Sequence, residues 1–413
     1  MNLVVATILA IGLSMSCCFS CDAQTSQTTL HRAKLESPGG DLVFGLRLDT
    51  SGGLLTASIV NGSEEIGVPE TAYDTDKREL TLGFSHYDSS IIAIWDGRSG
   101  SSLEGVWKKR TAGGNRWIEM KFSAEPTAST SSVHPQTDPK SSSDVSGRWA
   151  VDFDGDDDPS VGVFETAGGV AAGTFLTTTG DYRYLAGTCV DGKLTLSCFD
   201  GAHAFLFRAK IDDAGKMAGD FWSSTNWHDT WTAVRDDNAA LPDPLGLTTW
   251  NETVRLSDLK FPDVDGVMHS LDEEQFAGRA IVLQLFGTWC PNCDDAGSFL
   301  AELHKQYSPQ GLSVVGLAFE LTDDAERNAR QVQRYVARHR TKYPVLIAGL
   351  SDKAKATESF RALDRIRSYP TTVFLNGRGE VQAIYTGFSG PATGEEHERL
   401  KQKFHQIMRE TMK

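Results

Sequence analysis

The chain carries two kinds of hydrophobic pattern, and the change between them falls near residue 250. Before that point, short stretches alternate apolar and polar residues, as in 42–48 (LVFGLRL), and turns rich in glycine and aspartate separate them. Alternation with a period of two is typical of strands with one buried face. After that point, apolar runs alternate with polar segments long enough for helices. The first pattern predicts antiparallel β-structure and the second an α/β domain.

The β-rich part separates into two similar halves, residues 30–124 and 147–236. Two short stretches recur in the same order: Leu80-Thr-Leu and Ser102–Trp107 in the first half, and Leu194-Thr-Leu and Lys216–Trp222 in the second. We therefore expect an internally duplicated antiparallel unit with about four to six strands in each half. The two halves would either close together into one barrel or sandwich, or form one each.

Two polar connectors separate these regions. Residues 125–146 are rich in serine, threonine and proline, and residues 237–249 contain two prolines. Such segments have too few apolar residues to pack and predict linkers. The expected fold class is therefore multi-domain, with an all-β N-terminal region and an α/β domain over residues 250–413.

The apolar runs of the α/β region predict its strands, and the polar segments between them predict its helices. The predicted strands are 280–286, 312–319, 343–347, 371–375 and 381–385. The predicted helices are 294–307, 324–338, 353–363 and 394–408. The first strand runs almost directly into the first helix, and this junction carries the most informative motif of the chain.

That motif is Trp289-Cys-Pro-Asn-Cys293. Two thiols separated by two residues can close into a disulfide and reopen, a reaction that needs no cofactor. Unpaired N–H groups and the positive dipole end of a helix start stabilise a thiolate there. Cys290 is therefore the candidate nucleophile, and Cys293, one turn further on, is the candidate resolving thiol. The motif predicts dithiol–disulfide exchange with a Cys290–Cys293 disulfide as its oxidised form.

Residues 250–413 resemble the thioredoxin superfamily and, within it, the TlpA-like exported thiol-disulfide reductases. The resemblance rests on Phe286–Cys293 (FGTWCPNC) and on Ser368–Glu380 (SYPTTVFLNGRGE). In that superfamily the proline of the second motif is cis and faces the disulfide, and Pro370 matches it.

The resemblance also implies roles for the neighbours of these residues. Tyr369 and Thr371 would lie beside the sulfurs, with backbone groups of Tyr369 available to pair with a substrate strand. Trp289, Pro291 and Asn292 would shape the surface around the nucleophile.

Two departures concern the proton of the resolving thiol. Thioredoxin has a buried aspartate six residues before its first cysteine, where this chain has Gln284, a position that is usually uncharged in TlpA-like proteins. Many TlpA-like proteins have a glutamate three residues after the second cysteine, where this chain has Ala296. The nearest acidic replacements are Asp294, Asp295 and Glu320. Glu320 ends a predicted strand and is either the proton acceptor or a solvated strand-end residue.

Three other functions of this region compete with dithiol exchange as interpretations of the sequence. A C-x-x-C pair can be half of a zinc site, but no second ligand pair lies near it, so no metal is expected. Peroxiredoxins share the fold but have a threonine three residues before the reactive cysteine, where this chain has Gly287. A thioredoxin-fold peroxidase is therefore an alternative enzyme. The third alternative is a β-barrel module that binds a client or ligand, with a weakly active redox domain.

The two cysteines of the second β-rich half, Cys189 and Cys198, flank a predicted hairpin turn at Asp191-Gly192. In that register Cys189 opposes Leu194, and Cys198 lies beyond the reach of a direct bridge. We expect two buried thiols.

The N-terminal segment and the net charge bear on location and partners. Residues 1–23 combine an apolar stretch too short for a comfortable membrane span with a small, sulfur-rich end, which predicts a secretory signal. Cys17 or Cys21 is a candidate lipid-anchor site. The net charge of −15 argues against nucleic-acid binding. We expect export to the periplasm or cell envelope, with cysteine-containing client proteins and a membrane or periplasmic electron donor as partners.

Overall fold

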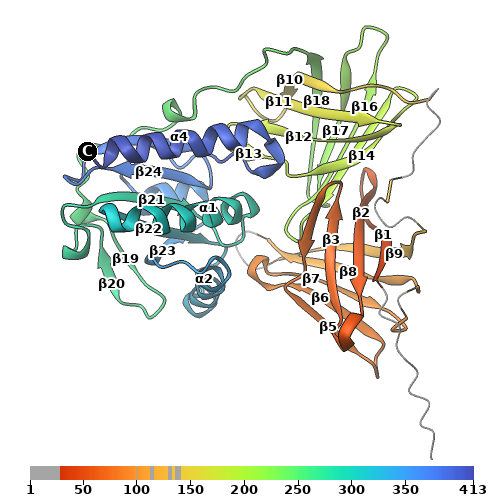
Figure 1. Ribbon diagram of the computed structural model, residues 1–413, viewed down its shortest axis with the longest axis horizontal. Helices are drawn as coiled ribbons and strands as arrows, with labels where there is room; N and C mark the ends of the chain where they lie inside the picture. The colour runs from red at the N-terminus through yellow and green to blue at the C-terminus, as the bar shows by residue number, and fades with distance from the viewer. Residues whose placement is uncertain (1–27, 99, 112–115, 129–132, 135–140) are drawn as a thin grey trace, which may run out of the picture.

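The computed structural model describes residues 28–98, 100–111, 116–128, 133–134 and 141–413 (Figure 1). The predicted signal segment, with Cys17 and Cys21, lies outside the described residues, as does part of the predicted 125–146 linker. Figure 1 shows the C-terminal domain on one side of the molecule and two β-rich units stacked along the other.

The first β-rich unit is an open antiparallel sheet of nine strands in the order β4-β3-β2-β1-β9-β8-β7-β6-β5. Its strands are β1 (Thr28–Ser37), β2 (Gly40–Asp49), β3 (Thr56–Asn61), β4 (Glu64–Gly67), β5 (Glu70–Asp74), β6 (Glu79–Phe84), β7 (Ser89–Ile94), β8 (Leu103–Arg110) and β9 (Trp117–Pro126). The first and last strands pair with each other, and β4 and β5 form the two edges. We call this unit the open sheet.

The second unit is a closed barrel. Its strands are β10 (Gly147–Phe153), β11 (Ser160–Ala167), β12 (Val170–Thr177), β13 (Gly180–Asp181), β14 (Leu185–Val190), β15 (Lys193–Phe199), β16 (Ala204–Ile211), β17 (Met217–Ser223) and β18 (Trp227–Arg235). Pairing of β11 with both β10 and β12 closes the ring, and the short β13 adds to β12. Phenylalanine and tryptophan rings such as Phe175, Phe207 and Trp231 pack inside it.

The expectation of four to six strands in each half was wrong, because each unit has nine. Tight hairpins cause the difference. β1 and β2, for example, pair directly up to Ser37 and Gly40, so the turn interrupts the alternating pattern for only two residues. The structure also decides the question that the sequence left open, since the halves form two separate sheets.

The recurring stretches occupy equivalent strands in the two units. Leu80-Thr-Leu lies on β6 and Leu194-Thr-Leu on β15, each two strands before the one that carries the Gly-Trp stretch. A Cβ atom at Gly105 would lie 2.0 Å from the Ile92 carbonyl oxygen, and one at Gly219 would lie 1.9 Å from that of Arg208. Both positions exclude a side chain for the same reason, close approach of the neighbouring strand.

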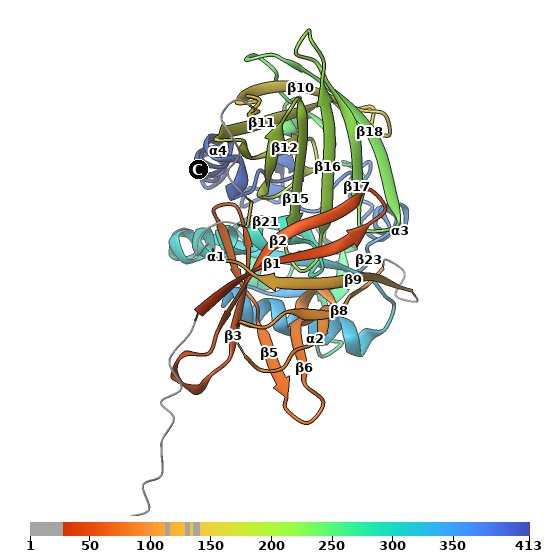
Figure 2. The same ribbon diagram turned by 90° about the vertical axis from the view of Figure 1, so that its right-hand side faces the viewer.

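The barrel completes the core of the open sheet. Phe199, at the end of β15, packs its ring against Phe44, Phe84 and Trp107 with centroid distances of 4.6, 5.9 and 5.4 Å. The Asn61 side chain binds the backbone N–H and carbonyl of Phe199 at 3.1 and 2.9 Å. Figure 2 shows the barrel lying over the open sheet, with β15 and β2 at the junction. The two units therefore share one hydrophobic cluster.

The C-terminal domain has a thioredoxin-like fold built on a sheet in the order β23-β22-β21-β24-β25. Its strands are β21 (Ala280–Phe286), β22 (Leu312–Glu320), β23 (Val345–Leu350), β24 (Thr371–Leu375) and β25 (Val381–Thr386). Its helices are α1 (Pro291–Tyr307), α2 (Ala325–His339), α3 (Lys353–Ser359) and α4 (Glu395–Thr411), and a hairpin of β19 (Lys260–Pro262) and β20 (Met268–Ser270) precedes them. The first three strands are parallel, and the last two are antiparallel to their neighbours.

All the predicted strands and helices of this domain are present; β21 and β24 have the predicted bounds, and the others have shifted ends. The helix predicted over 353–363 is shorter and ends at Ser359, because the buried residues that follow it, from Phe360 on, turn into the core. No helix among the described residues is long and apolar enough to cross a membrane.

Candidate active site

The C-x-x-C motif lies where β21 gives way to α1. Cys290 is the N-cap of α1, and its carbonyl oxygen accepts hydrogen bonds from the N–H groups of Cys293 and Asp294, both at 3.0 Å. Every residue of β21 is buried, which fixes the strand from which the loop departs. The helix start therefore places Cys290 beside the unpaired backbone N–H groups and the positive dipole end of α1.

The two sulfurs are free thiols in different surroundings. Cys293 is fully buried, and Cys290 is 8% exposed. The Cys290 Sγ atom lies 3.6 Å from the Tyr369 carbonyl oxygen, to which it can donate a hydrogen bond. Burial raises the pKa of Cys293 well above its ordinary value, and the hydrogen bond and charge of Cys290 raise it further. Cys293 thus retains its proton, while Cys290 is the sulfur nearer the surface.

The second predicted motif lies directly beside Cys290. The peptide bond between Tyr369 and Pro370 is cis, and Thr371 begins β24 and donates a hydrogen bond from its hydroxyl to the Ser368 carbonyl at 2.8 Å. The Tyr369 ring meets the Trp289 ring edge-on, with centroids 5.9 Å apart. The structure therefore brings both motifs together around Cys290.

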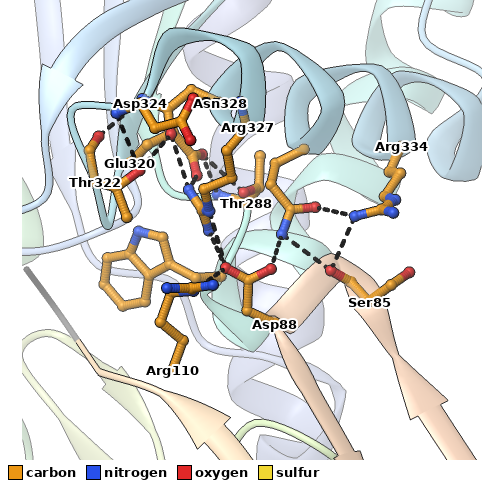
Figure 3. Close-up of polar contacts among 12 residues, drawn as sticks. Ser85, Asp88, Arg110, Thr288, Glu320, Thr322, Asp324, Arg327, Asn328 and Arg334 are labelled. Atoms are coloured by element: carbon orange, nitrogen blue, oxygen red, sulfur yellow. Dashed lines mark hydrogen bonds and ion pairs between the residues drawn. The ribbon is translucent and has the colours of Figure 1, made fainter. Parts of the chain in front are cut away.

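The Glu320 side chain binds the segment that connects β21 to α1. Its Oε1 atom accepts hydrogen bonds from the N–H and hydroxyl of Thr288 at 3.2 and 2.7 Å, and its Oε2 atom accepts one from Arg327 at 3.0 Å (Figure 3). Burial raises the pKa of Glu320, although the Thr288 hydrogen bonds and the Arg327 charge oppose the rise. In the described part of the chain, no hydrogen bond joins Glu320 to either sulfur. Its expected role as proton acceptor stays a prediction.

Arg327 links this site to the open sheet. Its guanidinium donates to the Asp88 carboxylate at 2.9 and 2.7 Å, and Arg110 of β8 donates to the same oxygen at 3.1 Å (Figure 3). Gln331, one turn further along α2, donates to the other Asp88 oxygen at 2.8 Å. Sequence reasoning missed this connection because the paired residues are far apart in the chain, and no local pattern indicates it.

The other two candidate acids next to Cys293 are engaged elsewhere. Asp294 binds Arg338 and His339 at 2.9 and 2.8 Å, and these partners hold its pKa below the ordinary value despite its burial. Asp295 forms an ion pair with Arg183 of the barrel, and burial raises its pKa to about 6. Both carboxylates are held in ion pairs, so neither replaces the glutamate that many TlpA-like proteins have at the position of Ala296.

Arg183 joins all three parts of the molecule. It lies between β13 and β14 and is buried, and its guanidinium pairs with Asp295 of α1, with Asp200 of the barrel at 3.6 Å and with Glu64 of β4 at 3.4 Å. Burial raises the pKa of Glu64 to about 7, while the Arg183 charge opposes the rise. We call Arg183 and these three carboxylates the Arg183 cluster.

The barrel also contacts the C-x-x-C motif itself. The Asn292 side chain, between the two cysteines, donates a hydrogen bond to the Asp181 carbonyl oxygen at 3.3 Å. The Ser368 hydroxyl donates to the Thr179 carbonyl oxygen at 2.7 Å. A Cβ atom at Gly180 would lie 2.1 Å from the Asn292 amide nitrogen. The β12–β13 turn, residues 177–181, thus lies against both motifs of the site.

A lysine of the open sheet contacts the barrel near its junction with that sheet. The Lys109 ammonium of β8 donates a hydrogen bond to the Ala202 carbonyl oxygen at 2.6 Å. Burial lowers the pKa of Lys109, and the negative charge of Asp200 opposes the change. Lys109 is therefore a further polar link between the two β-rich units.

The remaining thiols follow the expected register. Cys189 pairs with Leu194 across a hairpin whose turn residues Asp191 and Gly192 both have positive φ, at 50° and 67°. Cys189 and Cys198 are free and buried, as expected.

Comparisons with known proteins concern the C-terminal domain. Residues 254–384 match the AhpC/TSA family. Thiol-disulfide oxidoreductase ResA of Halalkalibacterium halodurans is 28% identical over 127 residues, which are 30% of this chain and 62% of ResA. Thioredoxin-like protein YneN of Bacillus subtilis is 26% identical over 156 residues, which are 35% of this chain and 84% of YneN. The C-terminal domain is homologous to these proteins.

Among solved structures, a thiol:disulfide interchange protein from Chlorobium tepidum is similar, with 22% identity and a TM-score of 0.29. The similarity covers 37% of this chain and 92% of that protein.

Proposed function

We propose that this chain is an exported thiol-disulfide oxidoreductase that reduces disulfides of client proteins through Cys290 and Cys293. The observation that supports it most is the pair of thiols at the start of α1, one buried and protonated, the other beside the Tyr369 carbonyl and the cis peptide bond. The homologous oxidoreductases named above support the same class of reaction.

The exchange proceeds in two steps that balance electrons and protons. The Cys290 thiolate attacks one sulfur of the client disulfide, whose S–S bond breaks and whose second sulfur leaves as a thiolate and takes up a proton. Cys293 then loses its proton and attacks the Cys290 sulfur of the mixed disulfide, and the second client thiol leaves. The client gains two electrons, and the chain ends as the Cys290–Cys293 disulfide.

A further partner must return the chain to its dithiol form. We propose a membrane or periplasmic electron donor, because the predicted signal in residues 1–23 would place the protein outside the cytoplasm, where thiols tend to be oxidised. The reduction potential of the Cys290/Cys293 couple against the donor and the client sets the direction of flow.

Reduction of insulin disulfides by the full chain, with dithiothreitol as electron source, tests the proposed reaction. Cys290→Ser should lose the catalysed rate, because the attacking thiolate is gone. Cys293→Ser should trap a mixed disulfide through Cys290, because the resolving thiol is gone. Cys189→Ser, which removes a buried barrel thiol, is the matched control and should keep full activity.

Turnover that survives in Cys290→Ser would overturn the proposal. Consumption of hydrogen peroxide far above that of a free thiol, and lost in the same variant, would favour the peroxidase alternative instead.

A further inference from the structure

The turn between β12 and β13 covers the redox site in the described conformation. Its carbonyl groups at Thr179 and Asp181 accept hydrogen bonds from Ser368 and Asn292, at 2.7 and 3.3 Å. Asn292 lies between the two cysteines, and Ser368 directly precedes the cis Tyr369–Pro370 bond. Both motifs that surround the sulfurs therefore bind the same barrel segment, and Cys290 is only 8% exposed.

These contacts are made to backbone atoms of the barrel segment. The residue between the two bound carbonyls is Gly180, with φ of +156°, where a Cβ atom would clash with Asn292. Hydrogen bonds to main-chain carbonyls do not depend on side-chain identity, so the donors on Ser368 and Asn292 suit any segment that presents two such carbonyls with a small residue between them. The barrel turn thus occupies a place where main-chain carbonyls of another segment can bind.

Polar contacts fasten the segment at its flanks. Asp158 of the barrel pairs with Arg367 and accepts a hydrogen bond from the Thr178 hydroxyl, both at 2.7 Å. The Asp181 carboxylate accepts a hydrogen bond from the Gly390 N–H at 2.6 Å. The Asp158–Arg367 pair is partly exposed and contributes little, whereas the more deeply buried pairs of Arg183 with Asp295 and of Arg327 with Asp88 hold the two sides together more firmly.

The hydrophobic cores on the two sides are separate. In the described part of the chain, the cluster of the C-terminal domain contains only residues from Leu245 onward, and the clusters of the open sheet and barrel contain only earlier residues. Polar interfaces between domains with separate cores allow the domains to move relative to each other. The open sheet and barrel share a core and would move as one body.

Two further features favour release of the segment. The Asn292 Oδ1 atom and the Tyr369 hydroxyl are buried without a hydrogen-bond partner among the described residues, which makes the closed contact costly. A cavity of about 1040 Å³ adjoins Thr177 and Thr178 and is also lined by Phe388 and Ser389 of the C-terminal domain. The segment therefore lies between the redox site and open space.

We propose that residues 177–181 act as a built-in pseudosubstrate that caps the redox site, so that a client segment reaches Cys290 only after the barrel moves away. The inference rests on the proposed function, because it assigns the capped groove to disulfide-containing clients. Those clients are polypeptide segments whose main-chain carbonyls replace those of Thr179 and Asp181 as acceptors for Ser368 and Asn292.

Alkylation of Cys290 in the reduced full chain measures the capping directly. Iodoacetamide labelling is followed by mass spectrometry of the peptide that carries Cys290, so the other cysteines do not interfere. Gly180→Val forces the turn away from Asn292, and Asp158→Ala removes its anchor to Arg367. Each variant should raise the labelling rate, by about three-fold for Asp158→Ala, whose ion pair is partly exposed, and by more for Gly180→Val, because the rate follows the population of the open state.

Gly192→Val is the matched control. It also places a β-branched side chain at a positive-φ glycine of a barrel hairpin, but the nearest heavy atom to its Cβ is the Ile211 carbonyl oxygen at 3.5 Å. Its labelling rate should equal that of the wild type. If circular dichroism shows that Gly180→Val does not fold, the labelling rate of Asp158→Ala alone tests the capping proposal.

The outcomes for capping and for the proposed function are distinguishable. Unchanged labelling in folded Gly180→Val and Asp158→Ala would overturn the capping proposal, whatever the insulin activity. Faster labelling without insulin reduction in any form would support the capping but overturn the proposed reductase. Faster labelling together with faster insulin reduction would support both.

Discussion

Cys293, in the first turn of α1, and Glu320, at the end of β22, are buried acidic groups, and burial raises the pKa of both. Proton transfer between two groups is efficient when their pKa values approach each other. A raised pKa therefore suits Glu320 to accept the proton that Cys293 must lose. The hydrogen bonds from Thr288 give the same carboxylate a second role, since they hold the segment that leads into Cys290.

Glu320→Gln separates these two roles. The amide can still hydrogen-bond Thr288, but it cannot take a proton, so the resolving step should slow by about ten- to a hundred-fold while the first attack is unchanged. Stopped-flow measurement of mixed-disulfide decay against its formation checks this. Equal decay in the variant and the wild type would make Glu320 a positioning residue only.

The residues of the candidate site could be predicted from local sequence. Cys290, Cys293 and the Tyr369–Pro370 pair belong to two short motifs whose residues all meet at the sulfurs. The contacts of Arg183 and Arg327 with the N-terminal units could not be predicted, because a buried ion pair between distant segments leaves no pattern in either one.

Among the elements, β15 couples the two β-rich units through its last residue. The Phe199 ring lies in the core of the open sheet, although its strand belongs to the barrel. A substitution at Phe199 should therefore affect both units.

Phe199→Ala should destabilise both units. Truncation of a fully buried phenylalanine leaves a cavity and costs about 3–5 kcal/mol in free energy of unfolding. Urea unfolding followed by tryptophan fluorescence checks this, because Trp107 of the open sheet and Trp231 of the barrel are both buried. The control is Trp227→Ala, whose side chain is 56% exposed and whose loss should change stability little. A loss below about 1 kcal/mol for Phe199→Ala would contradict the shared core.

Sequence patterns predicted the elements of the α/β domain better than those of the β units. Residues 280–286 and 371–375 form β21 and β24 with the predicted bounds, because stretches with few polar residues mark strands that are buried on both faces. The open sheet and the barrel differ in whether their edge strands pair with each other. That pairing depends on the curvature of the whole sheet, which no short stretch of sequence determines.

At the scale of the whole molecule, the Arg183 cluster makes the association of the three parts depend on pH. A raised pKa means that Glu64 and Asp295 bind protons more tightly in the assembled state than when exposed. Burial disfavours their charged forms, so the assembled state loses stability as pH rises toward about 7 for Glu64 and about 6 for Asp295. His86, whose pKa burial lowers to about 4, acts in the opposite direction.

The substitution Glu64→Gln isolates the contribution of Glu64 to this pH dependence of stability. The neutral amide mimics the protonated acid, so the variant should exceed the wild type in free energy of unfolding at pH 8 by on the order of 2–3 kcal/mol. The difference should shrink as pH falls to about 4.5, the ordinary pKa of the carboxyl. Urea titrations of both proteins across this range measure it, and the contribution of His86 cancels in the difference. A variant less stable at pH 8 would show that the Arg183 ion pair outweighs burial.

The shared core of the two β units also sets the order in which they can complete their folding during synthesis. Synthesis proceeds from the N-terminus, so β1–β9 exist before Phe199 and Leu206, which fill their core. The barrel can close on its own strands, but the open sheet stays unfinished until that barrel has formed. During this interval the apolar face that Phe199 will cover is available to other chains, and such exposure favours aggregation. The duplicated units are therefore unequal in their maturation, because the later one completes the earlier.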